Sequence, residues 1–245
     1  QIGVEGKFVA SYVGTHGMAH GLDTIIEAAE LLRDRDDIVL LMAGDGAERA
    51  RLHREIQQRG LTNVKMLGQL PKSDMPKLWS VSDVSLVLLR KLDLFLTVVP
   101  SKIFESMAMK KPIVMGVEGE SREIVQQAGN GLLMEPENPR HLSSALRQLA
   151  DSAELRHHLG ESGHHYARQH FDRAMLAETF ENRLLNLVAA GTPALAPGLA
   201  LVDTNQGETN AANLNPNPGT LVVSGEFRAH GSPALDAVVK RQGTG

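Results

Sequence analysis

Residues 8–43 read FVASYVGTHGMAHGLDTIIEAAELLRDRDDIVLLMA, and this stretch decides the class of fold. An apolar run at 8–13 ends in the turn Gly14-Thr15-His16-Gly17, and a second apolar run occupies 38–43. Between the two runs, apolar residues recur at helical spacing over 22–32. A strand, a helix and a second strand in this order predict a βαβ unit, whose strands are parallel.

The same alternation continues along the chain. The sequence predicts further strands at 64–68, 84–89 and 112–115, and helices from the Gly44-Asp45-Gly46 turn to Ile56, at 73–80 and at 101–109. Nearly continuous apolar strands separated by helices indicate an α/β fold, a Rossmann-like parallel sheet with helices on both faces. Such sheets bind ligands at the carboxyl ends of their strands, which is where glycines collect in this sequence.

Composition excludes several classes of protein. The chain has 245 residues, of which 42% are hydrophobic and 22% charged, as expected for a soluble globular protein. It has no cysteine, so disulfides, thiolate zinc sites, iron–sulfur clusters and thiol nucleophiles are excluded. A net charge of −4 and 4% aromatic residues argue against nucleic acid as a partner. No apolar run approaches the roughly 20 residues that cross a bilayer.

Two regions are predicted. Residues 1–190 form the α/β domain, whereas residues 191–245 are rich in Gly, Pro, Asn, Ala and Thr and are predicted to be a disordered tail with a short strand at 220–223. The first residues, Gln1-Ile2-Gly3-Val4-Glu5-Gly6, show neither an initiator Met nor a signal-peptide pattern. We therefore expect the chain to be part of a longer protein.

Two glycine-rich turns follow the first two strands. At Gly14-Thr15-His16-Gly17, glycine allows the backbone close to a ligand, and free amides can hold anionic oxygens. An ordinary tight turn explains this sequence equally well. The second turn, Gly44-Asp45-Gly46, has neither the third glycine of a dinucleotide fingerprint nor a following Lys-Ser/Thr pair. We expect Asp45 to form the turn and to cap the next helix.

The most informative stretch is VPSKIFESMA at residues 99–108. Pro100 and Ser101 are suited to begin a helix, and Lys102 places a cation in a first turn that disfavours positive charge. A bound anion would explain that cation. One turn later, the Glu105 carboxylate could accept hydrogen bonds from the vicinal hydroxyls of a ribose. The alternative is a capped surface helix in which Lys102 and Glu105 pair with each other.

Ten histidines raise the question of a metal site. His157-His158 and His164-His165 recur at helical spacing, but no carboxylate-rich ligand set accompanies them. We interpret them as a solvated helix face and predict no metal site.

An ordered set of motifs points to one family. The motifs are Tyr12-Val13-Gly14, His20-Gly21-Leu22-Asp23, Leu41-Met42-Ala43-Gly44-Asp45-Gly46, Asn63-Val64-Lys65-Met66-Leu67-Gly68, Ser82-Asp83-Val84, Pro100-Ser101-Lys102-Ile103-Phe104-Glu105, Lys111-Pro112-Ile113-Val114 and Gly129-Asn130-Gly131-Leu132. From about Phe8 to Ala190 the chain resembles the C-terminal, donor-binding half of a retaining group 1 (family 4) glycosyltransferase of the GT-B fold. The resemblance is closest to enzymes of bacterial capsule, O-antigen and exopolysaccharide synthesis.

The resemblance implies roles for individual residues. Glu105 matches the second glutamate of the E-x7-E motif and would bind the ribose hydroxyls, and Lys102 and Glu105 are the expected catalytic residues. The diphosphate and sugar would face Gly14, Thr15, His16 and Gly17. Ser101 and Lys102 would lie at the pyrophosphate, and Gly68 with Gln69 near the nucleobase. Glu123 matches a common family position.

The sequence also departs from the family pattern. Thr97 stands where the first E-x7-E glutamate would contact the donor sugar, and His20 stands where many relatives carry a phosphate-binding lysine. Lys102 is a candidate to supply that charge. The N-terminal domain that holds the acceptor site, and in many relatives a histidine near the scissile bond, has no counterpart in the 245 residues. We therefore expect the isolated chain to be inactive in sugar transfer.

The resemblance implies a transferase that moves sugar from a UDP- or GDP-sugar to a saccharide or lipid-linked acceptor, with no cofactor. It implies a cytoplasmic location, with the full enzyme peripherally associated with the membrane. Two alternatives remain, a non-catalytic nucleotide-binding module and a GT-B nucleotide-sugar epimerase. A nicotinamide oxidoreductase is disfavoured because Gly14-Thr15-His16-Gly17 lacks the dinucleotide spacing.

Overall fold

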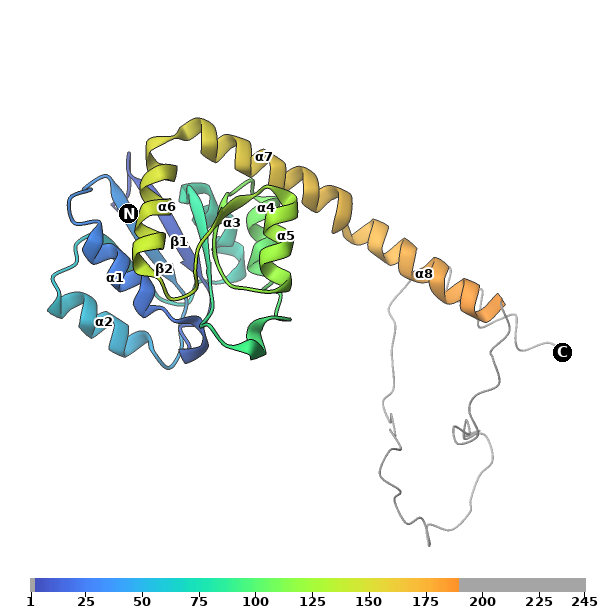
Figure 1. Cartoon of the computed structure of the whole chain (residues 1–245), viewed down its shortest axis with the longest axis horizontal. Helices are drawn as coiled ribbons and strands as arrows, with labels where there is room; N and C mark the ends of the chain where they lie inside the picture. Colours follow the sequence, from blue (N-terminus) through green and yellow to red (C-terminus); the bar gives the residue numbers. More distant parts are fainter. Residues whose placement is uncertain (1–2, 190–245) are drawn as a thin grey trace, which may run out of the picture. The chain divides into compact units, whose positions relative to one another are not determined.

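The computed structural model describes residues 3–189, which build a six-stranded parallel sheet (Figure 1). The strands are β1 (Phe8–Val13), β2 (Ile38–Ala43), β3 (Val64–Leu67), β4 (Val84–Leu88), β5 (Ile113–Gly116) and β6 (Gly131–Leu133). Their order in the sheet is β3-β2-β1-β4-β5-β6, and every neighbouring pair is parallel. The chain therefore reverses its direction of travel across the sheet between β1 and β4, where open α/β sheets form a crevice.

Residues 3–189 also form eight α-helices and three short 3-10 helices, of which α6, α7 and α8 follow the last strand. The α-helices are α1 (Asp23–Leu31), α2 (Arg49–Gln58), α3 (Met75–Val81), α4 (Lys102–Ala108), α5 (Glu120–Ala128), α6 (Pro139–Asp151), α7 (Ala153–His170) and α8 (Arg173–Ala189). The 3-10 helices are η1 (Met18–His20), η2 (Lys72–Asp74) and η3 (Asp93–Phe95). Figure 1 shows α7 running on into α8 after α6.

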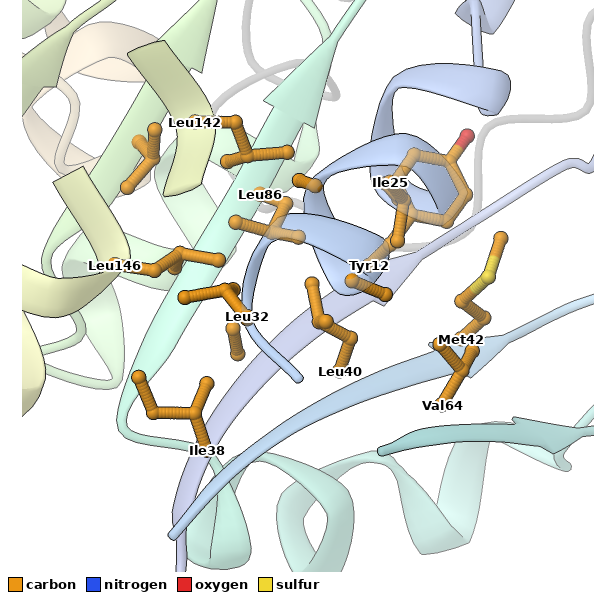
Figure 2. Packing of buried hydrophobic residues seen from close by; sticks show 14 of the residues in the cluster. Tyr12, Ile25, Leu32, Ile38, Leu40, Met42, Val64, Leu86, Leu142 and Leu146 are labelled. Atoms are coloured by element: carbon orange, nitrogen blue, oxygen red, sulfur yellow. The ribbon is translucent and has the colours of Figure 1, made fainter. Parts of the chain in front are cut away.

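One face of the sheet packs on α1, α2 and α6. Side chains of a strand alternate between the two faces, so Phe8, Ala10 and Tyr12 of β1 point to the same face. Figure 2 shows Tyr12 among buried side chains from β2, β4, α1 and α6, including Leu40, Leu86 and Leu146. This cluster is the largest part of the core, and it brings the Tyr12 ring beneath the carboxyl end of β1.

The other face is covered by α3, α4 and α5. Val9 of β1 packs with Leu41 of β2 and Leu78 of α3. Further along the sheet, Ile103 and Met107 of α4 pack with the strands β4 and β5 and with α5. Because both faces are covered, the central strands β1, β2, β4 and β5 are buried on both sides, which confirms the predicted parallel sheet with helices on two faces.

The structure corrects one local prediction. The helix after β2 begins at Arg49, with Glu48 at the N-cap position, so Asp45 does not cap it. Instead, the Asp45 carboxylate accepts a hydrogen bond from the N–H of Gly46 within the turn. The prediction that a helix begins at Ser101 is confirmed, since Ser101 is the N-cap residue of α4, although its side chain accepts no capping hydrogen bond. The predicted tail at 191–245 and the strand at 220–223 lie outside the described residues.

Candidate nucleotide-sugar site

The loops after β1, β2 and β3 meet at the carboxyl edge of the sheet. The N–H of Gly14 donates to the carbonyl of Ala43 over 2.9 Å, which continues the pairing of β1 with β2 past the end of β1. The N–H of His16 donates to Asp45 over 2.8 Å, and Gly44 donates to Gly68 over 3.2 Å. These bonds hold the predicted turn at 14–17 against the two neighbouring loops.

The close approach of these loops requires glycine. Gly44 has φ +144, and a Cβ there would lie 1.9 Å from the carbonyl oxygen of Gly14. Gly14 has φ +142, and a Cβ there would lie 3.1 Å from Lys102 Nζ. A side chain at Gly44 would therefore push the two loops apart, and one at Gly14 would crowd the Lys102 ammonium.

Lys102 reaches this edge from the first turn of α4. Its Nζ lies 4.2 Å from the centre of the Tyr12 ring, in a cation–π arrangement. No acceptor among residues 3–189 forms a hydrogen bond or ion pair with this ammonium. Burial lowers the pKa of Lys102 to about 8, and the Glu105 carboxylate opposes the decrease only in part. The side chain is therefore mostly protonated at pH 7, at a half-buried position that disfavours its charge.

Two backbone donors lie in the same loop. The N–H groups of Gly14, His16 and His20 all have carbonyl acceptors. Within the described part of the chain, the N–H groups of Thr15 and Gly17 have none. Free amides beside an unpaired ammonium form the kind of surface that binds anionic oxygens.

The two histidines of this loop contribute no charge at neutral pH. His16 is fully buried, and neither of its ring nitrogens has a hydrogen-bond partner within residues 3–189. Burial, followed by the positive charge of Arg49, lowers the pKa of His16. The pKa of His20 is lowered by burial and then by Lys102. The positive charges near these rings are therefore those of Lys102 and, beside His16, of Arg49.

A cavity of about 310 Å³ opens beside the loop. It is lined by Val13, Gly14, Thr15, Ala43, Gly44, Asp45, Gln69, Leu70 and Met75. Three of the predicted site residues, Gly14, Thr15 and Gln69, thus share one cavity. Leu70 and Met75 give it an apolar wall that the sequence analysis did not identify.

Ser101 and Glu105 lie on a different face of α4. Both are exposed, and Ser101 Oγ lies 3.5 Å from Glu105 Oε1. They line a groove of about 640 Å³ together with Phe104, Phe171 and residues of α7 and α8. The start of α4 is therefore open on this side. The structure does not bring Glu105 into the cavity beside Gly14. Lys102 and Glu105 form no ion pair, in contrast to the alternative interpretation of a surface helix on which these two side chains pair.

Tyr12 is the residue at this site to which the sequence analysis gave no role. It is fully buried, and its hydroxyl donates to the carbonyl of Thr15 over 2.8 Å. The available signal was its place in the first strand, one residue from the strand end and on the same face as Phe8 and Ala10. That signal predicts a core position but gives no indication of a contact with Lys102, which lies far along the sequence.

The histidine pairs lie on α7. His157, His158 and His165 are exposed, as predicted for a solvated face, whereas His164 is half-buried at the groove beside α4. In the part of the chain that the structure describes, no three His, Asp or Glu side chains cluster as metal ligands would. None of the helices between residues 3 and 189 is long and apolar enough to span a membrane.

Comparison with known proteins identifies a family. A family model described as Glycosyl transferases group 1 matches residues 2–166. WcaI of Escherichia coli K12, named as a glycosyl transferase of colanic acid biosynthesis, is 31% identical over 148 residues, which cover 59% of this chain and 36% of WcaI. The alpha-D-kanosaminyltransferase of Streptomyces kanamyceticus is 27% identical over 162 residues, covering 65% of this chain and 41% of that protein.

Solved structures share the fold. Anabaena HepE in complex with UDP superposes with a TM-score of 0.67 at 23% identity, over 76% of this chain and 51% of HepE. The C-terminal domain of LpcC, a group 1 family protein of Francisella tularensis, gives a TM-score of 0.59 at 22% identity, over 69% of this chain and 88% of that domain. The chain thus spans about half the length of HepE and less than half the length of WcaI and of the kanosaminyltransferase.

Proposed function

Because the chain belongs to the group 1 glycosyl transferases, we propose that it binds a nucleoside-diphosphate sugar at the carboxyl edge of its sheet. The diphosphate lies against the loop 14–17 and Lys102. In the complete enzyme, the sugar passes to an acceptor hydroxyl and the nucleoside diphosphate leaves. Retention of the anomeric configuration follows from the resemblance of the motifs to retaining enzymes.

The main observation that supports this proposal is the unpaired ammonium of Lys102. A half-buried cation without a counter-charge is unfavourable, and an anion at the same place would relieve that cost. Two free amides, those of Thr15 and Gly17, lie in the loop beside it. A diphosphate supplies several anionic oxygens and could accept hydrogen bonds from all three groups at once.

The same groups would act in the reaction itself. Negative charge grows on the diphosphate as the bond to the sugar breaks. Fixed donors aimed at that charge stabilise the transition state without having to reorganise. Lys102 and the loop amides would therefore act as electrostatic catalysts rather than as nucleophiles or bases.

The resemblance implies further contacts with the donor, and in this structure they line two separate cavities. Gln69, with Gly68 before it, stands at the cavity that Leu70 and Met75 line, which suits a flat, partly apolar nucleobase. Glu105 is exposed at the start of α4, where its carboxylate can accept hydrogen bonds from two ribose hydroxyls. Ser101 lies beside Glu105 and would contact the pyrophosphate.

The relatives narrow the choice of donor and pathway. HepE has been crystallised with UDP and with UDP-glucose, so a UDP-sugar is the first candidate donor. WcaI is named for colanic acid biosynthesis, which favours a saccharide or lipid-linked acceptor of a surface polysaccharide. The acceptor would bind a further domain, with the reaction in the cytoplasm at the membrane face.

A thermal-shift screen with UDP, GDP, ADP and their sugar conjugates tests the proposal. A ligand that binds only the folded state raises the melting temperature, so the preferred base is identified directly. Lys102→Met should lower the affinity for the preferred nucleotide about 10- to 100-fold. Lys77→Met is the matched control, because Lys77 is an exposed lysine on α3 that pairs with Asp74. Equal affinities of the two variants would refute the role of Lys102.

A second candidate is a nucleotide-binding module that transfers no sugar. Thr97 favours it, because the resemblance places there a glutamate that contacts the donor sugar, and a threonine hydroxyl cannot supply that carboxylate. The two functions separate in a transfer assay on a longer protein that carries residues 8–189 with an acceptor-binding domain. Nucleotide binding without any transfer would favour the module, and Thr97→Glu would then be expected to leave binding intact.

A further inference from the structure

Tyr12 lies beneath the candidate anion site and touches two of its parts. The Lys102 ammonium lies over the Tyr12 ring, 4.2 Å from the ring centre. The Tyr12 hydroxyl donates to the carbonyl of Thr15 over 2.8 Å. The ring is fully buried between α1 and the strands (Figure 2). One rigid side chain therefore contacts both the cation and the loop that holds the free amides.

We infer that Tyr12 is a positioning residue for donor binding, which sets the place of the Lys102 ammonium relative to the amides of Thr15 and Gly17. This inference rests on the proposed function. The lysine side chain has four rotatable bonds, and no hydrogen bond within residues 3–189 fixes its end. The face of the Tyr12 ring is the attractive surface that keeps Nζ at Gly14 instead of in solvent.

The hydroxyl contributes separately from the ring. Thr15 lies at the centre of the loop, and its carbonyl is held by Tyr12 while its own N–H remains free. The hydrogen bond fixes the peptide group between Thr15 and His16, which lies between the two peptide groups that carry the free N–H groups. Burial raises the pKa of the Tyr12 hydroxyl, so it remains a neutral donor over the working pH range.

The other groups near Lys102 do not replace Tyr12. The rings of His16 and His20 lie 5.9 Å from the Tyr12 ring, and neither forms a hydrogen bond with Lys102. Glu105, one turn later on α4, turns toward the groove beside α7. In the described part of the chain, Tyr12 is thus the side chain in direct contact with the ammonium.

The first test needs no nucleotide. Protons above the centre of an aromatic ring are shifted upfield, so the Lys102 Hε signals of the full chain should be upfield of those of other lysines. The shift should persist in Tyr12→Phe and disappear in Tyr12→Leu. An ordinary Lys102 shift in the unaltered protein would overturn the inference.

The second test measures UDP and GDP affinity in a double-mutant cycle. Tyr12→Leu should weaken binding about 5- to 30-fold when Lys102 is present, and much less in the Lys102→Met background. Tyr12→Phe keeps the ring and should lose only about 2- to 10-fold, through the loop. Phe8→Leu is the matched control, because Phe8 lies in the same core at the other end of β1, with Arg156 over its ring.

The outcomes separate the inference from the proposed function. Equal losses for Tyr12→Leu with and without Lys102, or an equal loss for Phe8→Leu, would overturn the positioning role while nucleotide binding stands. Failure of the unaltered chain to bind any nucleoside diphosphate would overturn the proposed function, and the positioning role with it. If Tyr12→Leu does not fold, the nucleotide-free spectrum and the Tyr12→Phe affinity still decide the matter.

Discussion

Lys102 and Gly44 show how single residues determine what this edge of the sheet can bind. Lys102 provides the charge, and Gly44 allows the β2 loop to lie directly against the β1 loop that faces that charge. The sequence alone does not show that Lys102 reaches this edge of the sheet, nor that Gly44 must lie against Gly14. The position of Lys102 near a helix start suggested an anion, but its contact with Tyr12 depends on β1 and β4 being neighbours in the sheet.

Gly44→Ala is predicted to destabilise the fold. The added Cβ would overlap the carbonyl oxygen of Gly14 and force a positive φ on alanine, a strain on the order of 1–3 kcal/mol. Gly60→Ala is the control, because Gly60 also has a positive φ but has no atom within 4 Å of the added Cβ. Urea denaturation should show a clearly larger loss for Gly44→Ala, and equal losses would contradict the close approach of the two loops.

Lys102 is also predicted to make stability depend on pH. Its pKa is about 8 when folded and near 10.5 when unfolded, so between these values the unfolded chain binds one more proton. The free energy of unfolding should therefore rise between pH 8 and 10, by at most about 2 kcal/mol. Below pH 8 both states are protonated and this contribution is constant.

Comparison with Lys102→Met isolates this effect. Denaturation at pH 7 and at pH 9.5 gives the unfolding free energy of both proteins. From pH 7 to pH 9.5, the unaltered protein should gain stability relative to Lys102→Met. A constant difference would show that the folded state does not disfavour the ammonium.

At the scale of elements, long apolar runs made the strands predictable. β1, β2 and β4 were located to within a residue because each is a nearly continuous apolar run of five or six residues. β6 was not predicted, since Gly131–Leu133 has only three residues, all half-buried. The start of α2 was less predictable, because a residue type that often caps helices, such as Asp45, can instead form the preceding turn.

Two helix starts test that last point. Asn138 caps α6 by accepting hydrogen bonds from the N–H groups of Arg140 and His141, both at 3.1 Å. Asn138→Ala should therefore lower the unfolding free energy by about 1 kcal/mol. Ser101→Ala should leave stability unchanged, because Ser101 makes no capping bond on α4. Thermal denaturation of the two variants gives the comparison, and an equal loss for Ser101→Ala would restore the capping role expected from sequence.

Within residues 3–189, the buried core is built by the elements before α8, whereas α8 itself exposes many apolar side chains. The buried clusters draw on elements from β1 to α7, whereas α8 contributes no buried residue, and Leu187 of α8 is 66% exposed. The sequence predicted the first arrangement from its alternating pattern. It could not predict that α8 is exposed, because apolar residues on an exposed helix can show the same spacing as those on a buried one.

Substitutions in the two regions should differ accordingly. Leu146→Ala removes a fully buried side chain of α6 and should cost about 2–5 kcal/mol of unfolding free energy. Leu187→Ala should stay within about 0.5 kcal/mol. Denaturant midpoints measured under one set of conditions provide the check. A large loss for Leu187→Ala would mean that α8 packs against other parts of the protein in solution.

The pH dependence of nucleoside-diphosphate affinity tests the central claim most directly. If Lys102 is the cation that holds the diphosphate, affinity measured by titration calorimetry should fall above pH 8, by up to about tenfold per pH unit. In Lys102→Met the affinity should be lower at pH 7 and should not show this additional fall, and Lys77→Met should behave like the unaltered protein. Identical pH profiles for the unaltered protein and Lys102→Met would contradict the account.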